Sequence, residues 1–331
     1  MADNKIALIT GAAGFIGLHT VKRFVSEGWF VYAVIHRRQS SRLDELQHQG
    51  KVLIFKSDVT DFEELKQLFE KLPEKISAVV HCAGRASDIG RAKEFRTTNF
   101  DSVRYLGELV SSYDIPRFVF VSTTDVYGMR DFHGEDESQL DYAARPINNY
   151  PKYKILAEKC IKDNMAPEKW CILRPAAVWG CDDPTMTKRL RDFFASSPFI
   201  IHFGKWKGQN RWPAVHVDSV ADACYLGAVA DEAAGEEINV IDTEKISVDQ
   251  FYRRIIKQYF PDKKFYKICL PFWVGWCAGA VVSGISNLFN LSTPIADPSL
   301  YAAYSVSSNL DFSGQKLLRI KKRYENRRNA H

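Results

Sequence analysis

The chain of 331 residues lacks the cysteine patterns that hold small or metal-bound folds together. Its seven cysteines include no C-x-x-C pair and follow no regular spacing, so we expect neither a disulfide framework nor a zinc site. The histidines are scattered too, and we predict no bound metal. The first residues run straight into an apolar strand, so no secretory leader is expected. These absences favour a globular protein of a reducing cytoplasm.

A strong charge of one sign is also missing. The net charge is only +5, and much of the excess lies in the last residues, "RIKKRYENRRNAH" (319–331). We expect this segment to be a solvated basic tail. Such a tail suits nucleic acid or an anionic membrane surface equally. We predict no nucleic-acid partner and keep peripheral membrane contact as an expectation.

What is present is a regular alternation of strands and helices. Five apolar runs resemble buried parallel strands, at 5–10, 30–35, 51–55, 77–82 and 117–122. Helical patterns separate them, the clearest being 61–72, which Thr60 or Asp61 could cap. This order predicts an α/β fold, a Rossmann-type doubly wound parallel sheet.

The alternation weakens near residue 180, so the domain boundary is not clean. We assign 1–180 to the nucleotide-binding domain, which also receives parts of 212–245. The strand at 170–174 and the helix near 217–230 would pass between the two parts. Residues 181–331 would form a smaller, mostly helical substrate lobe.

The first strand ends in the glycine-rich turn "TGAAGFIG". Gly11, Gly14 and Gly17 have no Cβ where a backbone must approach a pyrophosphate, and Phe15 and Ile16 complete the turn. The helix that follows would offer its free N–H groups to the anion. Glycines chosen for packing alone are the other interpretation. The position directly after a buried strand favours dinucleotide binding.

The end of the second strand selects between dinucleotides. It reads "VIHRRQSSR", with no acidic residue before Asp44 but with His36, Arg37, Arg38 and Arg42. An acid there would bind the NAD ribose, whereas guanidinium groups suit the 2′-phosphate of NADP. A basic surface loop is the alternative, but the sequence favours NADP(H) over NAD(H). Residues after the next two strands should face the adenine and ribose edges: Asp58, Val59, Cys82, Ala83 and Gly84.

A tyrosine and a lysine four residues apart open the helix after residue 148. Tyr150 and Lys154 would share one face, and Pro151 suits the first helical position. A phenol titrates near ~10, so a nearby ammonium would favour the phenolate that general base catalysis needs. Alone, this pair is equally typical of an ordinary charged helix start.

Residues 5–240 resemble the extended short-chain dehydrogenases/reductases. The resemblance is carried by six motifs: "TGAAGFIG", "HCAG", "VSTTDVYG", "YPKYK", "LRPAAVWG" and "VHVDSVADA". It implies that Tyr150 is the acid/base, that Lys154 holds the nicotinamide ribose and lowers the tyrosine pKa, and that Thr123 orients the substrate oxygen. Many members have serine at position 123, and some have threonine.

The same resemblance implies supporting residues. Asn99 resembles the family's structural asparagine, and Pro175 would lie near the cofactor. Thr124 neighbours Thr123, but its side chain should face the other way if the strand continues. A homodimer is usual in the family.

The substrate is less well defined. Residues 268–296 contain no Asp, Glu, Lys or Arg, a run longer than the ~20 residues that span a bilayer. Glycines, serines and Asn287 dilute it, so we expect a core helix, a lid over an apolar pocket, or an interfacial helix that the basic tail helps to dock.

This segment resembles the 3β-hydroxysteroid dehydrogenase and sterol-decarboxylating branch, which implies an apolar alcohol or ketone substrate. The alternative is a nucleotide-sugar epimerase, dehydratase or reductase, whose diphosphate Lys205, Lys207 and Arg211 could bind. Trp212, however, stands where those enzymes place an arginine. A non-catalytic NADP-sensing regulator is a third interpretation, and the intact Thr123, Tyr150 and Lys154 set argues against it. Reaction direction and any coupled isomerisation or decarboxylation are not predicted.

Overall fold

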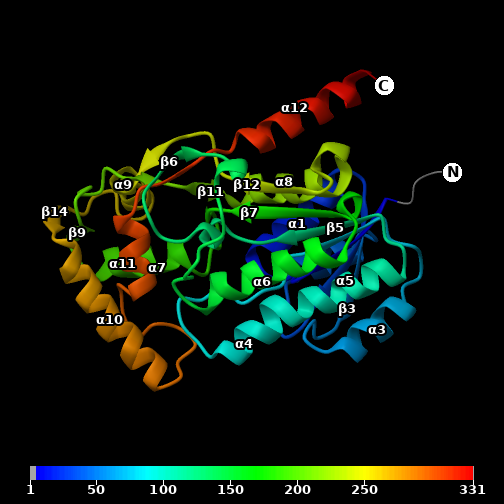
Figure 1. The fold of residues 1–331 in the computed structure, drawn as a ribbon, viewed down its shortest axis with the longest axis horizontal. Helices are drawn as coiled ribbons and strands as arrows, with labels where there is room; N and C mark the ends of the chain where they lie inside the picture. The colour runs from blue at the N-terminus through cyan, green and yellow to red at the C-terminus, as the bar shows by residue number, and fades with distance from the viewer. Residues whose placement is uncertain (1–4, 331) are drawn as a thin grey trace.

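A parallel sheet of seven strands forms the centre of the molecule (Figure 1). The computed structural model describes residues 5–330. In sheet order the strands are β12 (Glu236–Val240), β7 (Trp170–Pro175), β5 (Arg117–Val121), β4 (Ala78–His81), β1 (Ile6–Thr10), β2 (Phe30–Ile35) and β3 (Val52–Lys56). All neighbouring pairs are parallel.

This order confirms the predicted doubly wound fold. The chain runs from β1 outward to β3 and then returns to β4 on the other side of β1. The order therefore reverses between β1 and β4, and ligands of open α/β sheets bind at such a point, beyond the carboxyl ends of the strands. All five predicted strands are present, and the sheet also takes in β7 and β12.

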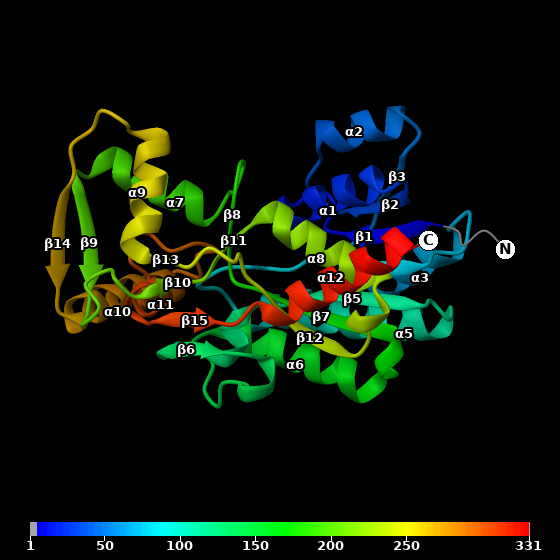
Figure 2. The same ribbon diagram turned by 90° about the horizontal axis from the view of Figure 1, so that it is seen from above.

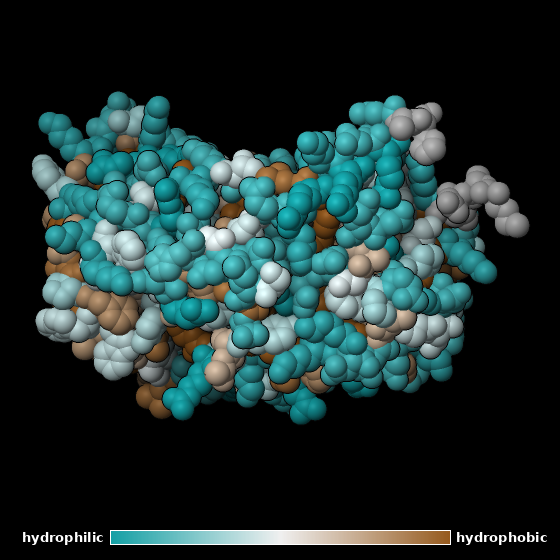
Figure 3. Space-filling model, turned by 45° about the horizontal axis from the view of Figure 1, so that its top comes forward, coloured by the Kyte–Doolittle hydropathy of each residue, from teal (hydrophilic) through white to brown (hydrophobic). Residues whose placement is uncertain are grey.

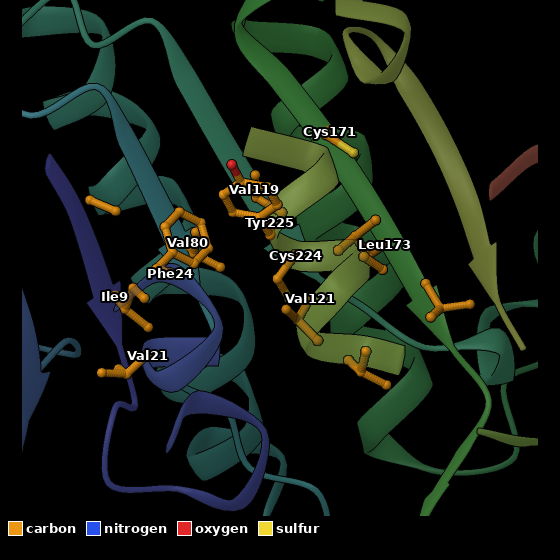
Figure 4. Packing of buried hydrophobic residues seen from close by; sticks show 14 of the residues in the cluster. Ile9, Val21, Phe24, Val80, Val119, Val121, Cys171, Leu173, Cys224 and Tyr225 are labelled. Atoms are coloured by element: carbon orange, nitrogen blue, oxygen red, sulfur yellow. The ribbon is translucent and has the colours of Figure 1, made fainter. Parts of the chain in front are cut away.

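Helices cover both faces of the sheet (Figure 2). One hydrophobic cluster joins the sheet to α1 (Phe15–Ser26), α2 (Ser41–His48), α8 (Val217–Val229) and α12 (Gln315–Ala330). Figure 4 shows part of it, with Phe24 of α1 and Tyr225 of α8 among the buried side chains. The second cluster joins the opposite face to α3 (Phe62–Glu70), α5 (Ser102–Ser112) and α6 (Asn149–Asn164). A short helix α4 (Ala92–Arg96) and a π-helical turn, Thr97–Asp101, lead into α5.

The remaining elements form the smaller lobe at one end. Its helices are α7 (Met186–Ser196), α9 (Val248–Tyr259), α10 (Phe272–Leu288) and α11 (Leu300–Ser307). Four strand pairs brace it: β9 (Phe199–Phe203) with β14 (Tyr266–Leu270), β10 (Arg211–Trp212) with β13 (Ile246–Ser247), β8 (Ala177–Trp179) with β11 (Ala214–His216), and β6 (Phe132–Glu135) with β15 (Leu310–Phe312). The lobe has its own core, centred on Phe194, Trp212 and Phe251.

The C-terminal segment differs from the predicted solvated tail. It forms α12, whose Leu317, Ile320 and Tyr324 pack on the main core cluster. Their spacing places them on one face of a helix. Four of the basic residues pair with acids, as Lys316 does with Glu236 at 2.8 Å; the others are Lys321, Arg327 and Arg328. The segment therefore packs on the nucleotide domain and not with the substrate lobe.

Helix α6 begins earlier than predicted. Asn148, whose side chain accepts from the backbone N–H of Tyr150 at 2.9 Å, is the N-cap, so Pro151 is the third helical residue and not the first. Proline is tolerated there because the first four N–H groups of a helix have no intrahelical partner. Of the two caps predicted for α3, Thr60 and Asp61, the structure shows Asp61, which accepts from Glu64 N–H at 3.1 Å.

Candidate active site

The glycine turn between β1 and α1 forms a tight cradle. Gly11 has φ +65°, and a Cβ on it would lie 2.7 Å from the backbone nitrogen of Ala83. A Cβ on Gly17 would overlap the carbonyl of Gly11. Gly14 is the N-cap of α1 and has no capping side chain. The turn therefore leaves helix N–H groups for an anion, and it fits the pyrophosphate of a dinucleotide.

The second strand leads to a basic rim. His36, Arg37 and Arg38 follow β2, are exposed and line the cavity described below. Asp58 is turned to its own loop: its carboxylate accepts from the backbone and hydroxyl of Thr60 and lies 3.6 Å from His36 Nε2. Arg42 reaches Asp182 at 3.3 Å. Arg37 and Arg38 therefore supply the positive charge at this rim, and the His36 ring lies toward Asp58.

Thr123 and Tyr150 meet at the carboxyl end of β5. The hydroxyl of Thr123 hydrogen-bonds the phenol of Tyr150 and accepts from Asp125 N–H at 3.2 Å. Thr124 also lines the cavity, contrary to the expectation that it faces away. The reason is local: β5 ends at Val121, and a 3₁₀ turn begins at Thr124, so strand alternation does not apply.

Lys154 lies one helical turn after Tyr150 and is buried. Its ammonium donates to the carbonyl of Val121 at 2.7 Å and lies over the Phe120 ring. Burial lowers its pKa to about 8, partly offset by Glu158. Gly84 lies directly in front of it, since a Cβ there would be 3.5 Å from Nζ. The ammonium therefore lies next to Gly84, just after β4. The predicted arrangement would hold a nicotinamide ribose at this place.

Asn99 fixes the loop that carries Gly84. Its amide accepts from Arg85 N–H at 2.7 Å and donates to Arg85 C=O at 2.9 Å. The side chain is buried in the π-helical turn before α5. Asn99 thus supports the site without lining it, the structural role that was predicted.

The tyrosine pKa differs from the sequence expectation. Burial and the carboxylate of Asp125 raise the pKa of Tyr150 above 10, and the hydrogen bond from Thr123 lowers it only in part. The Lys154 ammonium is oriented toward the Val121 carbonyl. The groups around the phenol therefore raise its pKa, and the positive charge of an oxidised nicotinamide, when bound, would act in the opposite direction.

A cavity of about 760 Å³ extends from the glycine turn into the smaller lobe. It passes Thr123 and Tyr150, so the cradle and the reactive phenol share one space. Beyond them its wall is mostly apolar and comes from the smaller lobe: Ala177, Met186, Leu190, Phe193, Phe203, Trp212, Val306 and Leu310.

Several polar residues of this cavity were not predicted from the sequence, among them Asp88, Asp125, Arg189, Asp297 and Tyr301. Asp125 accepts a hydrogen bond from Tyr301 OH at 2.9 Å, and burial raises its pKa to about 6. Arg189 binds two carboxylates, Asp88 at 2.8 Å and Asp297. Asp125 lies two residues after Thr123 in the same motif, so its place in the site could have been predicted from the sequence. Arg189, Asp297 and Tyr301 carry no motif, and only the folding of α7 and α11 brings them here.

Four residues predicted to bind cofactor lie off the cavity wall in the part of the chain that the structure describes: Asp58, Val59, Lys154 and Pro175. Val59 is buried in the core cluster that joins the sheet to α3, α5 and α6, and Pro175 precedes the lining residues Ala176 and Ala177. The others come together as expected: Gly11, Gly14, Phe15, Ile16, Gly17, His36, Arg37, Arg38, Cys82, Ala83, Gly84, Thr123, Thr124 and Tyr150.

Comparison with known proteins agrees with this geometry. The family model for the NAD-dependent epimerase/dehydratase family matches residues 7–240. The chain belongs to that family. It is therefore an enzyme of the extended short-chain dehydrogenase/reductase superfamily, an oxidoreductase that binds a nicotinamide dinucleotide.

Individual relatives are distant. The chain is 24% identical to the decarboxylating sterol-4-alpha-carboxylate 3-dehydrogenase of Mus musculus, over 84% of this chain and 75% of that one. Its fold matches the crystal structure of gox2253 with a TM-score of 0.73 at 18% identity, covering 96% of this chain and 92% of that one. UDP-glucuronic acid 4-epimerase from Bacillus cereus in complex with NAD gives 0.63 at 20% identity, covering 91% and 97%. These relatives differ in substrate and leave that question open.

Proposed function

We propose that the protein is an NADP(H)-dependent oxidoreductase that interconverts a secondary alcohol and a ketone on an apolar, sterol-like substrate. The observation that carries the proposal is the continuous cavity. It begins at the dinucleotide cradle, passes Tyr150, and ends among apolar side chains of the smaller lobe. Enclosed apolar walls with a few convergent polar groups are typical of sites for hydrophobic small molecules.

A nucleotide sugar would need cations in the cavity to bind its diphosphate, and the candidate cations lie elsewhere. Lys205 reaches Asp131 at 2.7 Å, and the Arg211 guanidinium donates to the carbonyl of Lys245 at 3.0 Å. Neither these two nor Lys207 lines the cavity in the described chain. Arg189 does line it, but Asp88 and Asp297 already neutralise its charge. A diphosphate would therefore enter a site that offers it little attraction.

The preference for NADP(H) rests on the rim after β2. Arg37 and Arg38 line the cavity and are exposed. The three residues that directly follow β2, 36–38, include no carboxylate. Guanidinium groups bind phosphate oxygens in a bidentate way. We infer that they hold the 2′-phosphate, while the glycine cradle holds the pyrophosphate.

The residues present can carry out the proton transfer of this reaction. When bound, the nicotinamide supplies or accepts the hydride. Tyr150 donates its phenolic proton to the carbonyl oxygen during reduction and takes a proton from the hydroxyl during oxidation. Thr123, which hydrogen-bonds the phenol, orients the same oxygen. Lys154 would hold the nicotinamide ribose.

A thermal-shift titration tests the substrate class. The NADP⁺-saturated protein is titrated with UDP, dTDP, GDP and CDP, and then with sterols and long-chain ketones. A ligand that binds only the folded state stabilises it by about 2.7 kcal/mol at a hundredfold excess over Kd. The proposal expects a shift with an apolar compound and none with the nucleotides. A clear shift with one nucleotide would instead identify the sugar carrier and overturn it.

A further inference from the structure

Helix α10 buries small residues and exposes most of its large apolar ones. Its buried residues are Gly275, Gly279 and Ser286, whereas most of its large apolar side chains point to solvent and Phe272 packs on Tyr304 of α11. Trp273 is 66% exposed and Leu288 75% exposed. We call the following set the exposed apolar face: Trp273, Trp276, Val281, Ile285 and Leu288 of α10, with Phe289 and Ile295 of the loop after it. A surface helix of a globular protein normally shows the reverse pattern.

Close contacts of the small residues hold α10 to the lobe. A Cβ on Gly279 would lie 2.8 Å from Leu300 Cα of α11, and one on Gly275 would lie 2.7 Å from the Phe203 ring of β9. Ser286 accepts from the backbone N–H of Ile295 at 3.1 Å. Small residues that let backbones approach while large ones face outward are characteristic of helices surrounded by lipid.

The size of the helix limits what it can do in a membrane. It has 17 residues, and none of the helices in residues 5–330 is long and apolar enough to cross a bilayer. A helix that cannot cross can lie in the plane of the membrane surface with its apolar side toward the acyl chains. Tryptophans such as Trp273 and Trp276 are enriched at that depth.

Charge is arranged around the exposed apolar face in the way that a bilayer surface favours. Residues 268–296 contain no charged side chain, and cations flank both ends. Lys264 and Lys267 precede α10, and Lys267 pairs with Asp249 at 3.3 Å. At the other end Arg91 donates to the Asn290 side chain at 3.0 Å, and Arg85, which pairs with Glu94 at 3.3 Å, reaches the Ser292 carbonyl. Cations beside an uncharged apolar face match a phospholipid surface, and Lys264 and Arg91 supply that charge here.

The same face lies next to the cavity. The hydroxyl of Ser87 donates to the Ser292 carbonyl at 2.9 Å, and Ser87 itself lines the cavity. Helix α11, which packs on α10, lines the cavity with Tyr301 and Val306. The loop that carries Phe289 and Ile295 therefore lies beside Ser87 of the cavity wall and leads to Asp297 and Pro298, which line the cavity.

We infer that the exposed apolar face docks on a phospholipid bilayer, inserting into one leaflet, and that an apolar substrate passes between bilayer and cavity beside Ser87. The second part rests on the proposed function, whereas docking is measured without turnover and can fail separately. Figure 3 shows brown and pale side chains gathered at the end of the molecule where α10 lies, on an otherwise mostly teal surface. A lipid surface accounts for an uncharged face, whose hydrogen-bonding groups are the indole N–H groups of Trp273 and Trp276, better than a protein partner does, because protein interfaces carry about one hydrogen bond per 100–200 Å².

The basic helix α12 is not part of this docking surface. Figures 1 and 2 place α12 over the nucleotide domain and α10 at the far end of the smaller lobe. The joint docking of apolar segment and basic C-terminus expected from the sequence is therefore replaced by docking through α10 alone.

Vesicle flotation of the full chain, saturated with NADP⁺, tests the inference. The probes are vesicles of phosphatidylcholine alone and of phosphatidylcholine mixed with phosphatidylserine. The test variant carries Trp273→Ser, Leu288→Ser and Phe289→Ser. The control carries Tyr113→Ser and Leu318→Ser, which remove exposed apolar side chains elsewhere. A second control, Lys322→Glu with Arg323→Glu, removes charge from α12. Thermal unfolding with and without NADP⁺ checks that each variant is folded, and Leu288→Ser alone provides a milder test.

We expect the wild type and both controls to float with neutral vesicles, and the triple variant to bind at least tenfold more weakly. Absence of wild-type binding to either vesicle would overturn the inference. So would binding to anionic vesicles alone that the α12 variant abolishes. A concentration-dependent dimer in light scattering that the triple variant dissociates, without vesicle binding, would assign this face to a second copy of the chain.

Discussion

Helices α1 and α10 both carry closely spaced glycines, yet they use them in opposite directions. In α1, Gly14 and Gly17 bring the backbone close to the turn at Gly11, and Val21 and Phe24 pack inward on the sheet. In α10, Gly275 and Gly279 bring the helix close to its own lobe, and the large side chains face outward. The glycines before and in α1 leave space for a bound ligand, whereas those of α10 leave its large apolar side chains exposed on the protein surface. Glycine spacing alone does not separate the two, but the direction of the large residues does.

The largest effect should come from Tyr150, which lines the cavity between the glycine turn before α1 and the smaller lobe that carries α10. Tyr150→Phe removes the transferred proton, so we expect turnover to fall about 10²- to 10⁴-fold while NADP⁺ still raises the unfolding temperature. Tyr153→Phe is the matched control, since this buried tyrosine of the same helix lines no part of the cavity. Unchanged turnover in Tyr150→Phe would remove the acid/base assignment.

The next effect separates the two dinucleotides on the α1 side. Arg37→Ala with Arg38→Ala should weaken NADP⁺ binding by about 10- to 100-fold, which corresponds to the loss of one charge-assisted hydrogen bond of about 1.5–3 kcal/mol. NAD⁺ binding should stay as it is. Calorimetric titration of both dinucleotides measures this, with Arg42→Ala, whose guanidinium pairs with Asp182, as control. Equal losses for both dinucleotides would mean that the rim does not read the 2′-phosphate.

Two alanine substitutions within α10 sharpen the comparison of glycines. Gly279→Ala places a Cβ against the α11 backbone and should destabilise the fold by about 1–3 kcal/mol. Gly284→Ala meets nothing within 4 Å and should stabilise by about 0.5–1 kcal/mol, because alanine is the better helix residue. Thermal or urea unfolding distinguishes them. Equal effects would show that α10 does not pack on α11 through its small residues.

The smallest effect concerns Asp125. Its folded-state pKa of about 6 lies above its ordinary 3.8, so the fold favours the protonated form. Its stabilising contribution is therefore present below about pH 4 and is lost as the pH rises through about 6. Asp125→Asn should lessen the pH dependence of the unfolding free energy across that range. Because the Asp125 carboxylate raises the Tyr150 pKa, the variant should also oxidise alcohol at lower pH. A pH profile identical to that of the wild type would contradict both effects.

The parts predicted from sequence are those that local rules determine. Parallel strands need continuous apolar runs, and a glycine turn needs positions without Cβ, so the sheet and the Gly11–Gly17 cradle were visible in the chain. Thr123 and Tyr150 were identified by motif. Thr124, predicted as a supporting residue, lines the cavity because the strand does not continue past Val121, so strand alternation does not turn it away. Arg189 and Tyr301 could not be found, since their place depends on how α7 and α11 fold over the cavity, which no short motif encodes. The C-terminal basic residues read as a solvated tail because Leu317, Ile320 and Tyr324 were not recognised as a packing face.

Cytoplasmic location, the homodimer and the absence of a nucleic-acid partner stay predictions. The seven cysteines are all free thiols in the structure. Of residues 5–330, no group of three or more His, Cys, Asp or Glu side chains could hold a metal ion.

Isotope transfer tests the central claim most directly. NADPH deuterated at the reactive carbon of its nicotinamide is incubated with the enzyme and a panel of sterol and long-chain ketones, and the products are weighed by mass spectrometry. We predict one deuterium at the new carbinol carbon of at least one apolar product, and about 10²- to 10⁴-fold slower incorporation when Tyr150→Phe replaces the wild type. Incorporation into a nucleotide-linked keto sugar, with none into any apolar ketone, would contradict the account.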